Sequence, residues 1–166
     1  MKRFLKILLY AILVAFVLIQ FYPKPGKNIA PMSSNDITLA HNVPPDVLQV
    51  LKTSCYDCHS NNTVYPWYSK VQPVAMWLGN HIEAGKGELN FSDFGSYPIG
   101  RKYKKLEEIN EQVTEGEMPL SSYTIIHRDA KLEERQKLLL THWVTALRDS
   151  IKANYPADSL IRKKKA

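Results

Sequence analysis

Two cysteines and a histidine within five residues form the chemically most informative run of the sequence. Cys55 and Cys58 are separated by two residues, and His59 follows at once. Residues three apart on a helix lie about one turn apart on the same side, so both thiols could add to the two vinyl groups on one edge of a porphyrin. The imidazole would then lie beneath the metal as its proximal axial ligand. This run is the attachment signature of c-type haem, and it predicts one covalently bound haem c.

Cys55 and Cys58 are the only two cysteines in the chain, and three other uses of such a pair stay open. The two thiols could form a disulfide in an oxidising compartment. A thioredoxin-like redox site also has this spacing, but it follows a strand, and no segment here alternates apolar and polar residues as a strand does. A structural zinc site needs further ligands, usually a second cysteine pair, which the sequence lacks. Covalent haem is therefore the favoured interpretation.

A haem held by His59 on one face needs a ligand or a closed pocket on the other. Met118 is the candidate distal axial ligand, because it lies in a Gly-Glu-Met-Pro run between two predicted helices. Pro119 stiffens the backbone after it and cannot donate to a helical hydrogen-bond ladder. A methionine more often fills a gap in a core, which is the alternative use of Met118. We expect ligation by its thioether.

Five further side chains are weaker candidates for the same position: His41, Met76, His81, His127 and His142. His81 falls in a predicted helix from which it could reach the haem. His127 is expected to hydrogen-bond a loop carbonyl, His142 to face away from the haem, and His41 to lie in solvent. If the sixth position were open, His81 would be the acid–base residue of a peroxidase-like enzyme or sensor.

Aromatic residues supply the apolar volume in which a flat macrocycle must be wrapped. The large ones that we expect to do so are Tyr65, Trp67, Tyr68, Trp77 and Trp143. Among them, Trp67 and Tyr68 are assigned to the haem pocket, where one of them could also donate a hydrogen bond to a haem propionate. Burial of the porphyrin and a thioether ligand would both raise the reduction potential.

The chain around the motif is predicted to be an all-α domain over residues 44–153. Pro45, with an acid directly after it, begins a helix that runs into the cysteine motif. A second helix begins after Pro73, and Gly85 and Gly87 are expected to end it. The motif would thus lie between two helices that fix its backbone.

Two longer helices are predicted in the second half of the domain. From Pro98 to Glu115, apolar residues recur at steps of three and four, which is the spacing of one helical face, and Gly116 ends the pattern. Asp129 is expected to cap the last helix. That helix would turn five apolar residues toward the core: Leu132, Leu139, Trp143, Leu147 and Ile151.

Residues 1–22 predict a single N-terminal transmembrane helix that anchors the chain. After the first three residues the run is apolar apart from Lys6 and Gln20, and about 20 such residues can cross a bilayer. Lys2 and Arg3 precede it, so the N-terminus should stay in the cytoplasm and the rest should be exported. No small-residue cleavage site follows, so a retained signal anchor is favoured over a cleaved signal peptide. The prediction is a single-pass inner-membrane protein whose domain faces the periplasm.

The remaining segments and the charge exclude one class of partner. Residues 23–43, rich in Pro, Gly, Ser and Asn, are predicted to be a flexible tether, and residues 154–166 a basic tail. The net charge is +6, but seven of the 22 basic residues lie in the N-terminal run and the tail, which leaves 15 against 16 acidic residues. The folded part is near neutral and has no basic stripe interleaved with aromatics, so nucleic acid is excluded as a partner.

Over about residues 44–145, the chain resembles the haem-binding domain family of exported bacterial c-type cytochromes. The matching stretches are Pro45 to Val47, Ser54 to Thr63, Tyr65 to Tyr68, Pro73 with Trp77, Leu89 to Ser92, Gly116 to Pro119, and His127 to Ala130 with Trp143. The resemblance implies a cytochrome c-like fold, haem attachment at Cys55 and Cys58, and iron ligation by His59. By analogy with class I cytochromes, it also implies Met118 as the sixth ligand.

We therefore expect a membrane-tethered, periplasmic electron carrier that exchanges single electrons with redox partner proteins. Ligation by histidine and methionine closes both axial positions, which suits outer-sphere electron transfer. The alternative is a haem enzyme or sensor, peroxidase-like, with an open or weakly held sixth position. A third possibility is a structural or partner-docking module in which haem serves as a folding core. A dihaem peroxidase is excluded, because it needs a second attachment motif.

Overall fold

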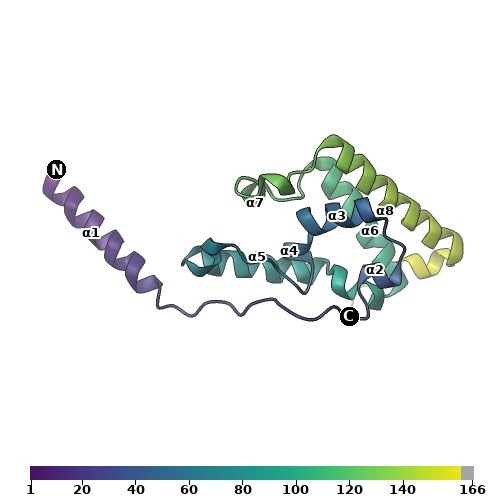
Figure 1. Cartoon of the computed structure of the whole chain (residues 1–166), viewed down its shortest axis with the longest axis horizontal. Coiled ribbons are helices and arrows are strands. Elements are labelled where there is room, and N and C mark those ends of the chain that lie inside the picture. The colour runs from purple at the N-terminus through teal and green to yellow at the C-terminus, as the bar shows by residue number, and fades with distance from the viewer. Residues whose placement is uncertain (162–166) are drawn as a thin grey trace.

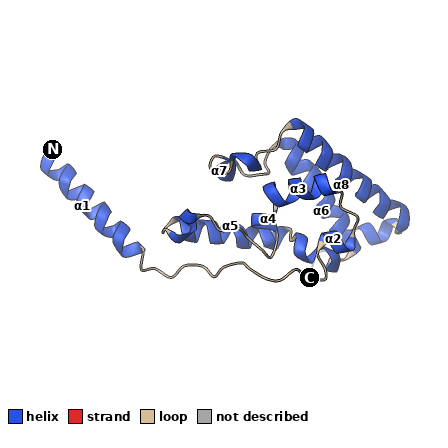
Figure 2. Cartoon of the chain, viewed as in Figure 1, coloured by secondary structure: helices blue, strands red, loops and turns tan. Residues whose placement is uncertain are grey.

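The computed structural model describes residues 1–161, and every regular element in them is a helix. The only pairing of extended segments there is one isolated bridge between Ile29 and Asn62, so the all-α prediction is confirmed (Figure 2). Residues 162–166 of the predicted basic tail lie outside the described residues. The elements are α1 (Lys2–Ile19), α2 (Ile37–Ala40), α3 (Pro45–Ser54), α4 (Tyr56–His59), η1 (Trp67–Lys70), α5 (Val74–Glu88), η2 (Phe91–Ser96), α6 (Ile99–Glu115), α7 (Ser121–Thr124), η3 (Arg128–Ala130), α8 (Glu134–Asn154) and η4 (Ala157–Leu160), where η marks a 3-10 helix.

The long helices α6 and α8 pack side by side, and α3 contacts α8 (Figure 1). Their apolar faces and the η2 segment form one core. Its fully buried members include Leu51, Phe91, Phe94, Leu106 and Leu140. The cysteine motif leaves this core at the end of α3, and α4 turns from there onto α5. The core thus fixes α3, and α3 fixes the motif.

Three helix boundaries set by proline or glycine agree with the predictions. Pro45 is the first residue of α3, with Asp46 in the first turn. Pro98 directly precedes α6, whose apolar face buries Leu106, Ile109 and Val113. Gly116 ends α6 with φ = 77°, in the left-handed region that a residue with a Cβ adopts at a cost.

Two predicted helix ends are wrong. Neither Gly85 nor Gly87 stops α5, which continues to Glu88. Asp129 does not cap α8 and lies instead in the short helix η3. The capping residue is Glu133, whose backbone N–H donates to the Gln136 side chain at 2.9 Å in a capping box.

In the middle of α8, the residues that face the core are each one position later in the sequence than predicted. Leu140 and Val144 are fully buried, and Ile151 is buried as expected. Leu139 and Trp143 lie at the edge of the core and are only partly buried. A stripe read from sequence spacing alone is displaced in this way when apolar residues occur at adjacent positions.

The N-terminal run forms α1, a helix of 18 residues with no buried residue. No helix in the described part of the chain is long and apolar enough to cross a membrane, which corrects the transmembrane helix predicted over residues 1–22. Lys2, Arg3 and Lys6 all lie inside α1, so its uncharged part is residues 7–19. At 1.5 Å per residue, that part rises only about 20 Å.

The segment after α1 contacts the domain at several points, although it was predicted to be a flexible tether. Gln20 and Gln72 exchange two hydrogen bonds of 2.9 and 3.0 Å, and Gln72 is fully buried. Pro25 lies so close to Gly79 of α5 that a Cβ there would be 2.5 Å from the proline ring. Further along, Ile37 is fully buried against η2. Residues far from the segment in sequence make these contacts, so its composition did not indicate them.

Candidate functional site

The cysteine motif lies at a break between two helices. The backbone of Cys55 has φ = −127° and ψ = −39°, which ends α3 and starts α4. Its N–H still donates to Leu51 of α3, and its carbonyl accepts from the N–H of His59 at 2.9 Å. Both cysteines are free thiols. The break holds Cys55, Cys58 and His59 on one short, rigid turn.

Gly85 of α5 lets this turn lie against the helix. A Cβ at position 85 would be 2.9 Å from the carbonyl oxygen of Cys58 and 3.3 Å from its Cβ, both closer than ordinary van der Waals contact. The residue read from the sequence as a helix stop is therefore the point of closest approach between α4 and α5. Sequence reasoning missed this role because the contact joins residues 27 positions apart.

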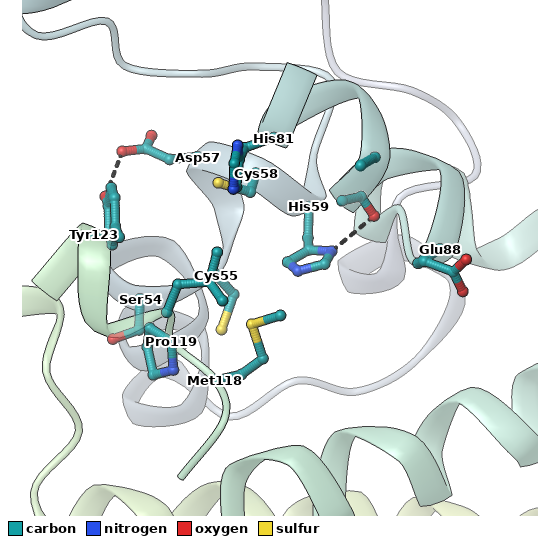
Figure 3. A pocket seen from close by; sticks show the side chains of 13 residues that line it. Ser54, Cys55, Asp57, Cys58, His59, His81, Glu88, Met118, Pro119 and Tyr123 are labelled. Atoms are coloured by element: carbon teal, nitrogen blue, oxygen red, sulfur yellow. Dashed lines mark hydrogen bonds between the residues drawn. The ribbon is translucent and has the colours of Figure 1, made fainter. Parts of the chain in front are cut away.

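His59 is oriented by the end of α5. Its Nδ1 lies 3.0 Å from the carbonyl oxygens of both Gly85 and Leu89, and Figure 3 shows one of these two bonds as a dashed line from His59. A carbonyl can only accept, so Nδ1 carries the proton and Nε2 keeps a free lone pair. Burial lowers the pKa of His59, although the two backbone hydrogen bonds oppose the shift. The neutral imidazole could therefore bind a metal ion through Nε2, while the hydrogen bonds of Nδ1 hold the ring in its orientation.

A cavity of about 220 Å³ opens beside the motif, and it gathers Cys55, Cys58, His59 and Met118 (Figure 3). A second cavity of about 250 Å³ adjoins it, because Cys55, His59 and Met118 line both. The second cavity reaches into the core, where apolar residues of α3, α6 and α8 close it. Four residues assigned to haem binding from the sequence therefore surround the same space.

The loop that carries Met118 is fastened to the end of α6. The N–H groups of Glu117 and Met118 both donate to the carbonyl of Gln112, at 3.0 and 3.1 Å. This leaves the Met118 side chain half-buried and turned to the cavity. Pro119 and Leu120 continue along the cavity wall to α7.

The two thiols are neutral near pH 7. Burial, followed by the neighbouring Cys58, raises the pKa of Cys55 to about 12. Burial, followed by the Asp57 carboxylate, raises the pKa of Cys58 to about 11. A zinc site requires thiolates and further ligands, and residues 1–161 contain no group of three potential ligands that could hold a metal ion. Burial thus disfavours the thiolate form that a zinc ion would need as a ligand.

Trp67 and Tyr68 are not brought to the cavity. Trp67 is 78% exposed, and neither residue lines the cavities around the motif. The Tyr68 hydroxyl instead meets Nε2 of His127 at 2.5 Å. His127 therefore contacts a tyrosine rather than the loop carbonyl that the sequence suggested. Both aromatic residues of η1 lie outside the predicted haem pocket.

The other histidines divide between the cavity and the rest of the domain. His81 lines the cavity, and its Nδ1 donates to the carbonyl of Trp77 at 2.9 Å. His142 is exposed, as expected. His41 is not in solvent: its ring packs edge-on against Phe94 at 5.8 Å, and burial lowers its pKa. Only His59 and His81 remain at the cavity among the described histidines.

Among the cavity residues that the sequence analysis did not select, two are hydrogen-bonded to each other. Asp57 and Tyr123 both line the space, and the Tyr123 hydroxyl donates to Asp57 Oδ2 at 2.7 Å. Asp57 is one of the two variable positions of the cysteine motif, so the motif itself gave no reason to select it. Tyr123 lies 66 residues away, and nothing in its local sequence indicates the contact.

The donor set of the cavity fits a haem. The space has an apolar lining, two adjacent thiols at one edge, and an imidazole whose Nδ1 is already hydrogen-bonded. A thioether lines the same space from a separate loop. A c-type haem needs these four groups and an apolar surround. The cysteine motif contributes three of these groups, and the loop after α6 brings the fourth to the same space.

Comparison with known proteins agrees with this chemistry. No curated protein and no solved structure matches the chain. One family model does match, over residues 14–146, and its description is a haem-binding domain. The match begins inside α1 and so includes the segment that docks on α5, in addition to the helices around the cavity. Since it covers most of the chain, the protein belongs to the haem-binding domain family.

Proposed function

We propose that the protein holds one c-type haem covalently through Cys55 and Cys58. The single observation that carries this is the cavity in which both thiols, the imidazole of His59 and the thioether of Met118 meet. Each thiol would add across one vinyl double bond: the sulfur–carbon bond forms at one carbon and the thiol hydrogen goes to the other. Atoms and electrons balance without an oxidant. The result is a cytochrome c-like arrangement on a four-residue helix.

His59 and Met118 are the proposed axial ligands. Nδ1 of His59 donates a hydrogen bond shared by two carbonyl oxygens, so Nε2 is the nitrogen that remains to bind iron. Met118 lies on a loop fastened to Gln112 and needs no helix to unwind in order to reach the cavity. A haem bound in this way supplies reversible one-electron chemistry. With both axial positions taken, the protein would act as an electron carrier for redox partner proteins.

A redox titration followed by absorption spectroscopy tests this function. We expect a single reversible one-electron transition, a low-spin ferric form, and the near-infrared sulfur-to-iron band of methionine ligation. The ferrous protein should bind carbon monoxide slowly or not at all, because Met118 must leave first. A high-spin ferric spectrum with immediate carbon monoxide binding would contradict the carrier role.

A haem enzyme or sensor is the second candidate, and one observation favours it. His81 lines the same cavity, and because its Nδ1 donates to Trp77, its Nε2 is free to exchange protons there. In that case peroxide should react rapidly with the ferric protein, and His81→Ala should slow that reaction about 100-fold or more. In a carrier with Met118 on the iron, the same substitution should leave the spectrum and the potential unchanged.

We also propose export, and attachment to a membrane through the exposed apolar surface of α1, without a helix that crosses the bilayer. Every large apolar residue of α1 is exposed or half-buried, and no residue of the helix is buried by the domain. Covalent haem attachment also implies a location outside the cytoplasm. A C-terminal alkaline phosphatase fusion should be active, and the full-length protein should sediment with membranes. A protein found in the soluble fraction with an inactive fusion would refute this part.

A further inference from the structure

We propose that Tyr123 is a positioning residue for the haem site: by its hydrogen bond to Asp57, it ties the loop of Met118 to the cysteine motif. The proposal rests on the proposed ligation by Met118, since it concerns how firmly that ligand is held. It assigns a role to a residue pair that spans the cavity from α4 to α7. No other part of the proposed function requires this pair.

The bond joins the two sides of the site directly. Tyr123 donates to Asp57 Oδ2 at 2.7 Å, and both residues line the cavity (Figure 3). Asp57 lies between the two cysteines on α4. Its second oxygen, Oδ1, accepts from the N–H of Val64 at 2.9 Å, which fixes the carboxylate in place. The acceptor is therefore part of the motif and is itself immobilised.

The face of the Tyr123 ring packs against the ring of His127. The two rings stack at 4.3 Å between centroids with an interplanar angle of 14°. His127 Nε2 in turn meets the Tyr68 hydroxyl at 2.5 Å. This arrangement orients the ring independently of its hydroxyl. A phenylalanine at position 123 would keep the stacking and lose only the bond to Asp57.

Tyr123 is closely coupled to Met118 along the chain. The backbone N–H groups of Tyr123 and Thr124 both donate to the carbonyl of Leu120, at 3.0 Å each. Only Pro119 separates Leu120 from Met118. At its other end, the segment is fastened to Gln112 of α6 through two backbone hydrogen bonds. The loop therefore has two attachment points, one on α6 and one on the cysteine motif.

A loop fastened at both ends holds the thioether against iron with little freedom. If the attachment at Asp57 is lost, the Leu120 end can move, and the open state without iron–sulfur contact becomes more populated. A hydrogen bond to a charged carboxylate is among the stronger ones in proteins. Its loss should raise the rate at which external ligands replace Met118 by roughly tenfold or more.

The test compares ligand replacement in full-length, haem-loaded variants. The probe is imidazole binding to the ferric protein in stopped flow, at concentrations where departure of Met118 limits the rate. Tyr123→Phe should bind imidazole about tenfold faster than the native protein and show a weaker near-infrared sulfur band. Asp57→Ala, which removes both carboxylate oxygens, should have at least as large an effect, and the double variant should be no faster than the faster single variant. Tyr155→Phe, at the distant end of α8, is the matched control and should not change the rate.

The outcomes separate this proposal from the proposed function. A native protein that lacks the sulfur band and binds imidazole immediately would refute ligation by Met118. If the native protein shows the sulfur band but Tyr123→Phe binds imidazole at the native rate, the positioning role of Tyr123 is refuted and ligation by Met118 is not. A fast Tyr123→Phe with a native-like Asp57→Ala would also refute it, because Asp57 would then not be the partner. Should Tyr123→Phe fail to fold, the Asp57→Ala rate decides in the same way.

Discussion

The backbone of Cys58 lies against Gly85 of α5 at a distance that leaves no room for a side chain at position 85. A Cβ there would meet the Cys58 carbonyl oxygen at 2.9 Å. The same glycine offers its own carbonyl to His59 Nδ1 at 3.0 Å. One residue of α5 therefore fixes both the path of the motif and the orientation of the proposed proximal ligand.

Gly85→Ala should consequently destabilise the domain, by roughly 1–3 kcal/mol, because backbone atoms would have to move to admit the methyl group. The measurement is urea unfolding of the haem-loaded protein. Gly87→Ala is the matched control on the same helix, since nothing lies within 4 Å of a Cβ there. That variant should be unchanged or up to about 1 kcal/mol more stable. Equal effects of both substitutions would show that the contact with Cys58 does not matter.

Met118→Ala should open the sixth position of the iron. Loss of the thioether removes a ligand that favours the ferrous state, so the reduction potential should fall and the near-infrared sulfur band should vanish. Carbon monoxide should then bind rapidly to the ferrous form, while covalent haem is retained. His81→Ala is the control, because His81 lines the same cavity but is not a proposed ligand. If the two variants exchange these phenotypes, His81 is the ligand instead.

The start of α8 provides a test of how the last helix is capped. Glu133→Ala should cost about 1 kcal/mol of unfolding free energy, because it removes the carboxylate from the capping box with Gln136. Asp129→Ala should have a much smaller effect, since that residue lies in η3 and outside the helix. Thermal unfolding followed by circular dichroism distinguishes the two. A larger loss in Asp129→Ala would contradict the structure at this point.

Much of the fold could be predicted because its signals are local. Pro45 and Gly116 mark helix ends through backbone geometry that depends on one residue. The apolar face of α6 follows from spacing within a single segment. The motif at Cys55 likewise carries its meaning within five residues. Such features need no knowledge of the tertiary structure.

Three of the failed predictions depended on distant contacts. Gly85 was read as a helix stop because glycine commonly ends helices, whereas its role here is to admit Cys58. Trp67 was placed in the haem pocket because aromatic residues wrap porphyrins, yet the tertiary structure leaves it exposed. Tyr123 was overlooked, since only the fold brings it to Asp57. Residue type suggested a use in each case, and the partner across space determined it.

The measurement that tests the account most directly is the intact mass of the protein produced in cells with a cytochrome c maturation system. The account predicts a single species heavier than the polypeptide by one haem, which persists after denaturation and extraction with acid acetone. Cys55→Ala combined with Cys58→Ala should return the mass to that of the polypeptide alone. A native protein whose haem passes into the acid-acetone phase, leaving the polypeptide mass unmodified, would contradict covalent attachment and with it the proposed site.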